Sequence, residues 1–187
     1  MNKIHHSSNK DDWCTPPWLF NLLNDTFDKQ IKIDLCATKE NSLAEYYLND
    51  IFTDEIPKKY YNTFAFCNPP YRRKSPNTWD FVKRCEELTS DPYNLTIIML
   101  LPARTDVMTW HDTIIKRCMI HFIKGRLKFI SNGVEHKHPA PFPSAVCIMS
   151  KTTPGNMGYS ICKNEQYFIP CNPYRTYEFD YNLDRYV

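Results

Sequence analysis

The sequence predicts an α/β fold in which one mostly parallel sheet carries helices on both faces. Short apolar segments that suit strands alternate with amphipathic segments that suit helices, the pattern of a sheet built from crossover units. Residues 95–102 (LTIIMLLP) form a continuous run that is apolar except for Thr96, which is typical of a central strand buried on both sides. The 187 residues suffice for one domain with a substantial core. We therefore expect a single domain over residues 12–187 after a flexible, polar N-terminus over residues 1–11.

The N-terminal part of this pattern contains two predicted strands and two predicted helices. Thr15 can cap a helix over residues 16–25, in which two opening prolines suit the first turn and the apolar residues form one stripe. Residues 31–36 (IKIDLC) alternate and are rich in β-branched side chains, which predicts a strand. A second strand is predicted over residues 62–67 (NTFAFC) and a short helix over residues 42–48.

The C-terminal part continues the alternation. Amphipathic patterns predict helices over residues 77–89 and 106–117. Apolar, β-branched runs predict strands over residues 118–123 and 144–150. The remaining expectations are pairing of residues 126–130 with the next part of the chain, a polar loop over residues 131–143, and short strands at 159–162 and 166–169.

The composition is typical of a soluble globular protein, with 42% hydrophobic and 24% charged residues. No apolar run approaches the roughly 18 to 20 residues that would span a bilayer, so no membrane partner is expected. The N-terminus lacks the apolar stretch of a signal peptide, which makes the cytoplasm the expected location. The net charge of +2 neither indicates nor excludes a polyanionic partner, and oligomeric state stays open.

The cysteine and glycine content excludes several kinds of site. No two of the eight cysteines are closer than nine positions, so the short spacings of zinc and redox sites are absent. We expect free thiols that act as small apolar side chains, and no metal. The first 124 residues contain no glycine, which excludes a GxGxxG loop or a P-loop from that part.

Polar side chains gather at the ends of three predicted strands. In open parallel sheets ligands bind beyond the carboxyl ends of the strands, so neighbouring strands would bring these ends to one cleft. A carboxylate at the first end suits a ribose hydroxyl or an ammonium group, although a lone aspartate there more commonly forms a turn. The three ends are Asp34 with Cys36 and Ala37, then Asn68-Pro69-Pro70-Tyr71, then Pro102 with Arg104, Thr105 and Asp106.

The Asn-Pro-Pro-Tyr segment fits a planar amino group. The prolines fix φ and hold their carbonyls in set directions, Asn68 adds a side-chain acceptor, and Tyr71 adds an aromatic face. Accepting both hydrogens of an amine such as adenine N6 favours a lone pair localised on nitrogen, ready for a methyl donor. The competing interpretation is a rigid turn, which becomes weaker because the segment directly follows an apolar strand. A shorter copy, Cys171-Asn172-Pro173-Tyr174, lacks the second proline and is interpreted as a terminal turn.

Several segments together make the chain resemble the phage-type DNA N6-adenine methyltransferases, a Dam-related group that uses S-adenosylmethionine. NPPY alone also occurs in methyltransferases that act on protein glutamine and on ribosomal RNA, so the order of the later segments is what favours the phage group. The resemblance covers residues 11–150. Its segments are DDWCTPPWLF (11–20), IDLCATKENS (33–42), FCNPPY (66–71), LLPARTDVMTWHD (100–112), KGRLKF (124–129) and PFPSAV (141–146).

The resemblance implies a Rossmann-like methyltransferase fold, S-adenosylmethionine as cofactor and, if the gene is phage-encoded, a location in the host cytoplasm and protection of phage DNA from restriction. It implies catalysis by Asn68, Pro69, Pro70 and Tyr71. One departure from the wider methyltransferase pattern is DLCAT in place of a Gly-rich DxGxG loop. At this loop Ala37 restricts the approach of a ligand to the backbone more than glycine would. The implied cofactor-binding residues are Trp13, Thr15, Pro16, Asp34, Cys36, Ala37, Asp54, Phe66 and Asn68.

DNA is the expected partner, and basic residues near the predicted cleft suit its phosphates. A solvated basic turn is an equal alternative for the cluster after the motif, and Arg104 and Arg126 can instead pair with Asp106 or Glu135. The chain has no room for a separate target-recognition domain, so base specificity is expected to rest on loops 72–78 and 131–143. The candidate DNA contacts are Arg72, Arg73, Lys74, Arg104, Arg126 and Lys137.

The sequence thus predicts methylation of the adenine N6 amino group in DNA, with the base flipped into the Asn-Pro-Pro-Tyr pocket. Methylation of RNA adenine or of a protein glutamine through the same motif is the alternative enzyme function. A methyltransferase fold that binds but no longer reacts is a further hypothesis, and the intact residues 68–71 argue against it.

Overall fold

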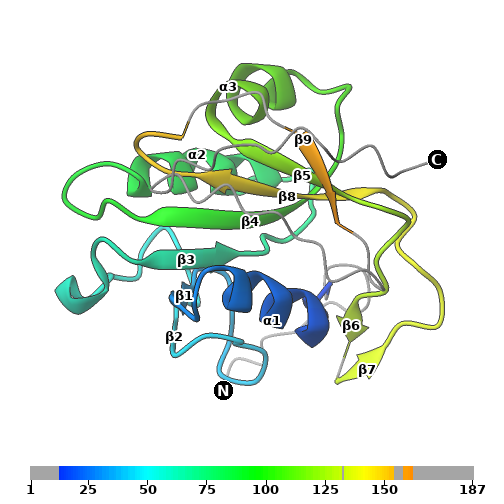
Figure 1. The fold of residues 1–187 in the computed structure, drawn as a ribbon, viewed down its shortest axis with the longest axis horizontal. Helices are drawn as coiled ribbons and strands as arrows, with labels where there is room; N and C mark the ends of the chain where they lie inside the picture. Colours follow the sequence, from blue (N-terminus) through cyan, green and yellow to red (C-terminus); the bar gives the residue numbers. More distant parts are fainter. Residues whose placement is uncertain (1–12, 132, 154–157, 162–187) are drawn as a thin grey trace, which may run out of the picture.

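The computed structural model describes residues 13–131, 133–153 and, by their backbone alone, 158–161. Within these residues one sheet of seven strands has the order β2-β1-β3-β4-β8-β5-β9, and β6 and β7 form a separate two-stranded ribbon (Figure 1). The strands are β1 (Ile31–Asp34), β2 (Tyr46–Tyr47), β3 (Phe64–Cys67), β4 (Thr96–Pro102), β5 (Met119–Ile123), β6 (Ile130–Ser131), β7 (Val134–Glu135), β8 (Ser144–Met149) and β9 (Gly158–Ile161).

The sheet is mostly parallel, as the alternating pattern predicts. Strands β2, β1, β3 and β4 form consecutive parallel pairs, and β5 and β9 form another. Strand β8 lies between β4 and β5 and runs antiparallel to both. This mixed α/β sheet with helices on both faces confirms the Rossmann-like fold class.

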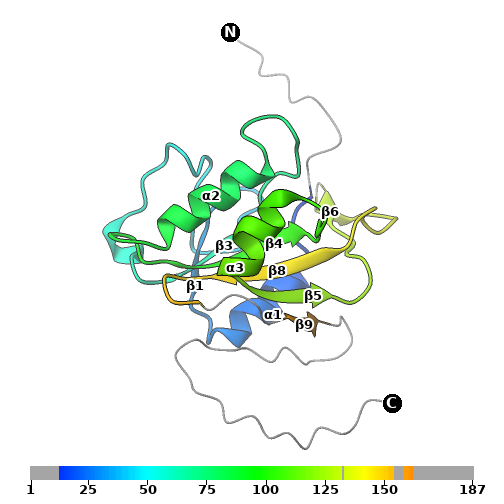
Figure 2. The same cartoon turned by 90° about the horizontal axis from the view of Figure 1, so that it is seen from above.

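Helices cover both faces of the sheet. Helix α1 (Pro17–Thr26) lies on one face, and α2 (Thr78–Leu88), η2 (Trp110–Ile114) and α3 (Ile115–Arg117) lie on the other (Figures 1 and 2). A short 3-10 helix, η1 (Lys58–Tyr60), precedes β3. Strand β4 is buried along its whole length, which is the feature that its almost wholly apolar sequence predicts.

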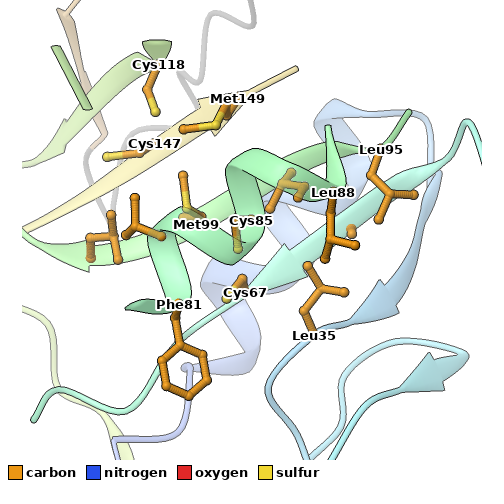
Figure 3. Close-up of a cluster of buried hydrophobic side chains, with 14 of the residues drawn as sticks. Leu35, Cys67, Phe81, Cys85, Leu88, Leu95, Met99, Cys118, Cys147 and Met149 are labelled. Carbon is orange, nitrogen blue, oxygen red and sulfur yellow. The ribbon is translucent and has the colours of Figure 1, made fainter. Parts of the chain in front are cut away.

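Alternate residues of β4 belong to different cores. Ile97, Met99 and Leu101 pack in the cluster beneath α2 and η2, whereas Ile98 and Leu100 pack in the cluster beneath α1. Figure 3 shows Cys85 of α2 in the first cluster with Met99 of β4. Several cysteines are therefore ordinary small core residues, since Cys85, Cys118 and Cys147 are fully buried.

Two predicted elements differ in the structure. Residues 42–48, predicted as a short helix, instead contain β2, which pairs with β1 through Ile33 opposite Tyr46 and Asp34 opposite Tyr47. The prediction was wrong because this strand is too short to show a period of two, and its backbone is held by pairing with β1. Within the predicted helix 106–117, residues 110–114 form a wider π turn before α3. The predicted strand at 166–169 and the second Asn-Pro copy at 171–174 lie outside the described residues.

The register of the strands brings the polar ends together. Asp34, the last residue of β1, lies opposite Tyr47 of β2 and Phe66 of β3, and Cys67 lies opposite Met99 of β4. The residues that come after β2, β1 and β3 therefore leave the sheet at one edge. No helix in the described part of the chain is long and apolar enough to cross a membrane.

Candidate active site

A cavity of about 370 Å³ lies beyond the carboxyl ends of β2, β1 and β3. The N-terminal segment before α1 and the start of α2 complete its wall. Its lining residues are Trp13, Cys14, Thr15, Asp34, Cys36, Ala37, Thr38, Asn41, Leu43, Asn49, Asp50, Phe52, Asn68, Pro69, Pro70, Arg72, Pro76 and Phe81.

The side chain of Asn68 is held by the N-terminal segment. Its amide nitrogen donates to the carbonyl oxygen of Trp13 at 2.6 Å and to the hydroxyl of Thr15 at 3.0 Å. The amide oxygen Oδ1 is buried, and none of the described residues gives it a hydrogen-bond partner. A buried acceptor without a donor is costly, so this oxygen is a strong candidate to receive a ligand hydrogen.

The carbonyl of Pro70 is already occupied. It accepts hydrogen bonds from the Arg72 backbone N–H at 3.0 Å and from the Thr78 hydroxyl at 2.9 Å. Thr78 is the first residue of α2, whose N-terminus is fixed by a capping box between Asn77 and Asp80. None of the hydrogen bonds among described residues ends on the Pro69 carbonyl, which leaves it and Asn68 Oδ1 as acceptors within the motif.

Tyr71 closes the motif but does not line the cavity. Its hydroxyl donates to the Leu100 carbonyl of β4 at 3.0 Å. Its ring makes edge contacts with Phe129 and Phe142, with centroids 6.0 and 5.4 Å away. Burial raises the pKa of the Tyr71 hydroxyl well above its usual value, so it is a neutral donor.

Asp34 is a buried carboxylic acid facing this cavity, with only 4% of its surface exposed. Burial raises its pKa from 3.8 to about 6, and hydrogen bonds from the backbone of Cys36 and Leu43 partly oppose that rise. The bond from Cys36 N to Asp34 Oδ1 measures 3.3 Å. Because burial disfavours the charged form of this acid, the site suits a ligand that brings hydrogen-bond donors or positive charge.

Cys36 lies against Cys67, with 3.5 Å between their sulfur atoms. Burial raises the pKa of the Cys36 thiol, and the contact with Cys36 contributes most to the raised pKa of Cys67. Both groups are therefore neutral thiols at physiological pH and unsuited to act as nucleophiles.

The predicted cofactor residues divide into two groups. Six of them line the cavity, whereas Pro16, Phe66 and Asp54 do not. Pro16 is the N-cap of α1, and Phe66 is buried against Phe20 with ring centroids 5.4 Å apart. The six are Trp13, Thr15, Asp34, Cys36, Ala37 and Asn68.

Asp54 shapes the loop after β2. Its Oδ2 accepts from the backbone N–H groups of Asn49 at 2.8 Å and Asp50 at 3.0 Å. Asn49 and Asp50 are the residues of this loop that reach the cavity, together with Phe52. These three were not predicted as site residues, because residues 42–48 were interpreted as a helix and no polar strand end was expected after them.

The predicted DNA contacts lie in different places. Arg72 lines the cavity, and its Nε donates to the Pro76 carbonyl at 2.6 Å. Arg73 and Lys74 are exposed beside it, and Arg104 and Lys137 are exposed on other loops. Arg126 instead borders a second cavity of about 270 Å³ with Lys124, Lys128 and Trp18. Lys128, rather than Arg126, forms an ion pair with Glu135 at 3.5 Å.

In the described part of the chain, no group of three or more histidine, cysteine, aspartate or glutamate side chains could hold a metal ion. The cavity is instead bordered by amide, carboxyl, carbonyl and aromatic groups, which suit an organic ligand with both polar and apolar parts.

The fold and the site define the class of protein. A Rossmann-like sheet with the buried Asp34 at the end of β1 and with Asn68, Pro69 and Pro70 after β3, all lining one cavity, is the arrangement that the family resemblance implies for a methyltransferase acting on an amino group.

The comparisons with known proteins give the family. The model of the DNA N-6-adenine-methyltransferase (Dam) family matches residues 3–167, so the chain belongs to this family and is an adenine-specific DNA methyltransferase. A DNA N-6-adenine-methyltransferase of Haemophilus phage HP1 (strain HP1c1) is 27% identical over 128 residues, which are 67% of this chain and 69% of the phage protein. Comparison with the solved structures gave no match. The resemblance to the phage-type group is thereby confirmed.

Proposed function

We propose that this chain transfers a methyl group from S-adenosylmethionine to adenine N6 in DNA, with the target base flipped into the cavity beside Asn68-Pro69-Pro70-Tyr71. The observation that carries the proposal is the buried Oδ1 of Asn68, an acceptor that no described residue satisfies, in a residue that lines the same cavity as Asp34. Family membership supports DNA adenine as the substrate.

The residues at the cavity fit S-adenosylmethionine. Asp34 would receive hydrogen bonds from its ammonium or ribose groups, and Asp50, which is exposed beyond β2, is a second carboxylate for hydroxyl groups. Phe52 and Phe81 supply apolar surface for a planar base. When bound, the cofactor supplies an electrophilic methyl group on its sulfonium centre.

The motif would hold the amino group by its two hydrogens. Asn68 Oδ1 accepts one and the Pro69 carbonyl accepts the other, since the Pro70 carbonyl is already engaged by Arg72 and Thr78. Two acceptors on the N–H bonds favour a lone pair localised on nitrogen, so no strong base is needed to make the amine reactive. Positioning and electrostatics provide the catalysis.

A base in a duplex has to leave the stack before it can reach this cavity, which costs a few kcal/mol. Stacking on an aromatic side chain returns about 1–3 kcal/mol, and we assign this contact to the half-buried ring of Tyr71, which follows Pro70 just outside the cavity lining, so the base would extend beyond the cavity to reach it. Arg73 and Lys74, exposed immediately after the motif, would bind the neighbouring phosphates. In this proposal loops such as 72–78 read the bases, so the recognition sequence would be short.

The test is incubation of the purified chain with S-adenosylmethionine and unmethylated DNA, followed by sequencing that maps N6-methyladenine. We expect methylation by the native chain and none by Asn68→Ala, although that variant still binds the cofactor in calorimetry. Near-native activity of Asn68→Ala would exclude the mechanism. Tritium transfer to RNA or to protein, with DNA unlabelled, would instead favour the alternative acceptors of the Asn-Pro-Pro-Tyr motif.

A further inference from the structure

We infer that the segment Trp13–Thr15 is a positioning clamp for Asn68, and that it fixes which end of the Asn68 amide faces the substrate amine. The inference rests on the proposed function, in which Asn68 Oδ1 is an acceptor for that amine. It assigns to this segment a role toward the catalytic motif itself, in addition to any contact with the cofactor.

The clamp uses both hydrogens of the amide nitrogen. One points to the Trp13 carbonyl at 2.6 Å and the other to the Thr15 hydroxyl at 3.0 Å. A carbonyl oxygen can only accept, so the Asn68 atom beside it has to be the nitrogen. A rotation of the amide by half a turn would place two acceptor oxygens in contact, which the clamp therefore prevents.

This orientation matters for the reaction. With the nitrogen engaged, the oxygen is left as the only end of the amide that is available to a ligand. The reverse orientation would present N–H donors to the N–H donors of the substrate amine. The Thr15 hydroxyl can donate or accept, so the Trp13 carbonyl selects the orientation and the Thr15 hydroxyl restrains the remaining rotation.

The clamp segment is itself held by backbone hydrogen bonds to Ile130 and by ring contacts of Trp13. Backbone hydrogen bonds join Cys14 N to Ile130 O at 3.1 Å and Ile130 N to Cys14 O at 2.9 Å. The Trp13 ring stacks on His136, with centroids 5.1 Å apart, and meets the edge of Phe129 at 5.3 Å. Thr15 is only 7% exposed. A rigid segment can hold a partner to a fraction of an ångström, as a catalytic group requires.

Two variants of Thr15 test the clamp. Thr15→Val keeps the shape and removes the hydroxyl, whereas Thr15→Ser keeps the hydroxyl. We expect Thr15→Val to lower the single-turnover rate of DNA methylation about tenfold, the effect of losing one hydrogen bond that holds the reacting geometry. Thr15→Ser should restore most of that rate. The dissociation constant for S-adenosylmethionine, measured by calorimetry, should change much less than the rate in both variants.

A second readout does not depend on turnover. The melting temperature is measured for the native chain, Thr15→Val, Asn68→Ala and the double variant. If the two side chains are bonded, Thr15→Val lowers the melting temperature in the native background and has little further effect in the Asn68→Ala background.

The outcomes separate this inference from the proposed function. If Asn68→Ala is inactive but Thr15→Val keeps the native rate, or if the two melting-temperature effects simply add, the clamp is wrong and the proposed function stands. A rate loss in Thr15→Val that is matched by an equal loss of cofactor affinity also overturns the clamp. If Asn68→Ala remains active, the proposed function has failed.

Discussion

The hydroxyl of Tyr71 donates a 3.0 Å hydrogen bond to the carbonyl oxygen of Leu100, so the last residue of the Asn-Pro-Pro-Tyr motif is anchored to the central strand β4. The first residue of the motif is anchored to the N-terminal segment, and its third residue to the start of α2. Three separate parts of the chain thus hold four consecutive residues.

The Tyr71 hydroxyl and the Tyr71 ring should have separate effects, the hydroxyl on stability and the ring on the methylation rate. Tyr71→Phe removes the hydroxyl and leaves the Leu100 carbonyl without this donor, so it should lower the free energy of unfolding by about 1 kcal/mol. Because Tyr71→Phe keeps the aromatic ring, the methylation rate of this variant should fall much less than the rate of Tyr71→Ala. Denaturant unfolding and single-turnover methylation measure the two effects, and equal rates for the two variants would remove the stacking role from Tyr71.

Asp34 predicts a pH-dependent stability difference. Its pKa is raised from 3.8 to about 6 in the folded protein, so the folded state binds more protons than the unfolded state between these values. The stability of the ligand-free protein therefore falls as the pH rises through this window, and the penalty is complete above pH 6. Asp34→Asn should remove that penalty, on the order of 3 kcal/mol at pH 7 to 8, with the gain vanishing below about pH 4.

The matched control for that measurement is Asp112→Asn. In the native chain the Asp112 carboxylate forms an exposed ion pair with Lys116 at 3.6 Å, so little change in stability is expected from this replacement. A gain in Asp34→Asn that is the same at pH 4 and pH 8 would contradict the assignment of the penalty to the buried charge.

Asn68→Asp should not preserve function, although it keeps the size and one acceptor oxygen. A carboxylate has no hydrogen to offer the Trp13 carbonyl, which lies 2.6 Å from the native nitrogen. Only the protonated acid can replace that donor, so the methylation rate of the variant relative to the native chain should decrease as the pH rises. Taking the ratio cancels the titration of groups common to both proteins, and a ratio independent of pH would speak against the clamp at Trp13.

The exposed basic pair after the motif predicts a change in the salt dependence of DNA binding. Replacing both Arg73 and Lys74 by alanine should weaken binding and reduce the slope of log K against log salt by about 2, one for each lost phosphate contact. The control is the double replacement of Lys58 and Lys59 in η1, which removes the same charge before β3, away from the carboxyl ends of the strands. Fluorescence anisotropy across a salt series distinguishes them, and equal slopes for the two double variants would place the DNA elsewhere.

The long elements and the motif could be predicted from the sequence because their signals are local. The apolar run at 95–102 specifies a buried strand, and the amphipathic pattern of residues 77–89 specifies α2. The two-residue strand β2 has no such signal, since it exists through its pairing with β1. Because β2 was not predicted, Asn49 and Asp50, which follow it at the cavity, were not predicted as site residues.

The contacts of Asn68 could not be predicted for a different reason. Trp13 and Thr15 were expected beside the cofactor through family resemblance, but their bonds to Asn68 join residues 55 and 53 positions apart. Such a contact depends on how α1 packs on the sheet, which no local pattern encodes. The backbone contacts of Asp54 could not be predicted either, because an acidic residue that binds nearby backbone N–H groups has the same local sequence as one that reaches a ligand.

Strand β8 determines when the sheet can be completed during synthesis. It lies between β4 and β5, so β5 has no neighbour on that side until Ser144–Met149 have left the ribosome. A nascent chain that ends before residue 144 has β1, β2, β3 and β4 as one parallel unit, with an uncovered edge on β4. Such an edge is a template for pairing between chains. Synthesis up to β8 therefore leaves this edge open, and truncating the chain before residue 144 should favour aggregates over the folded enzyme.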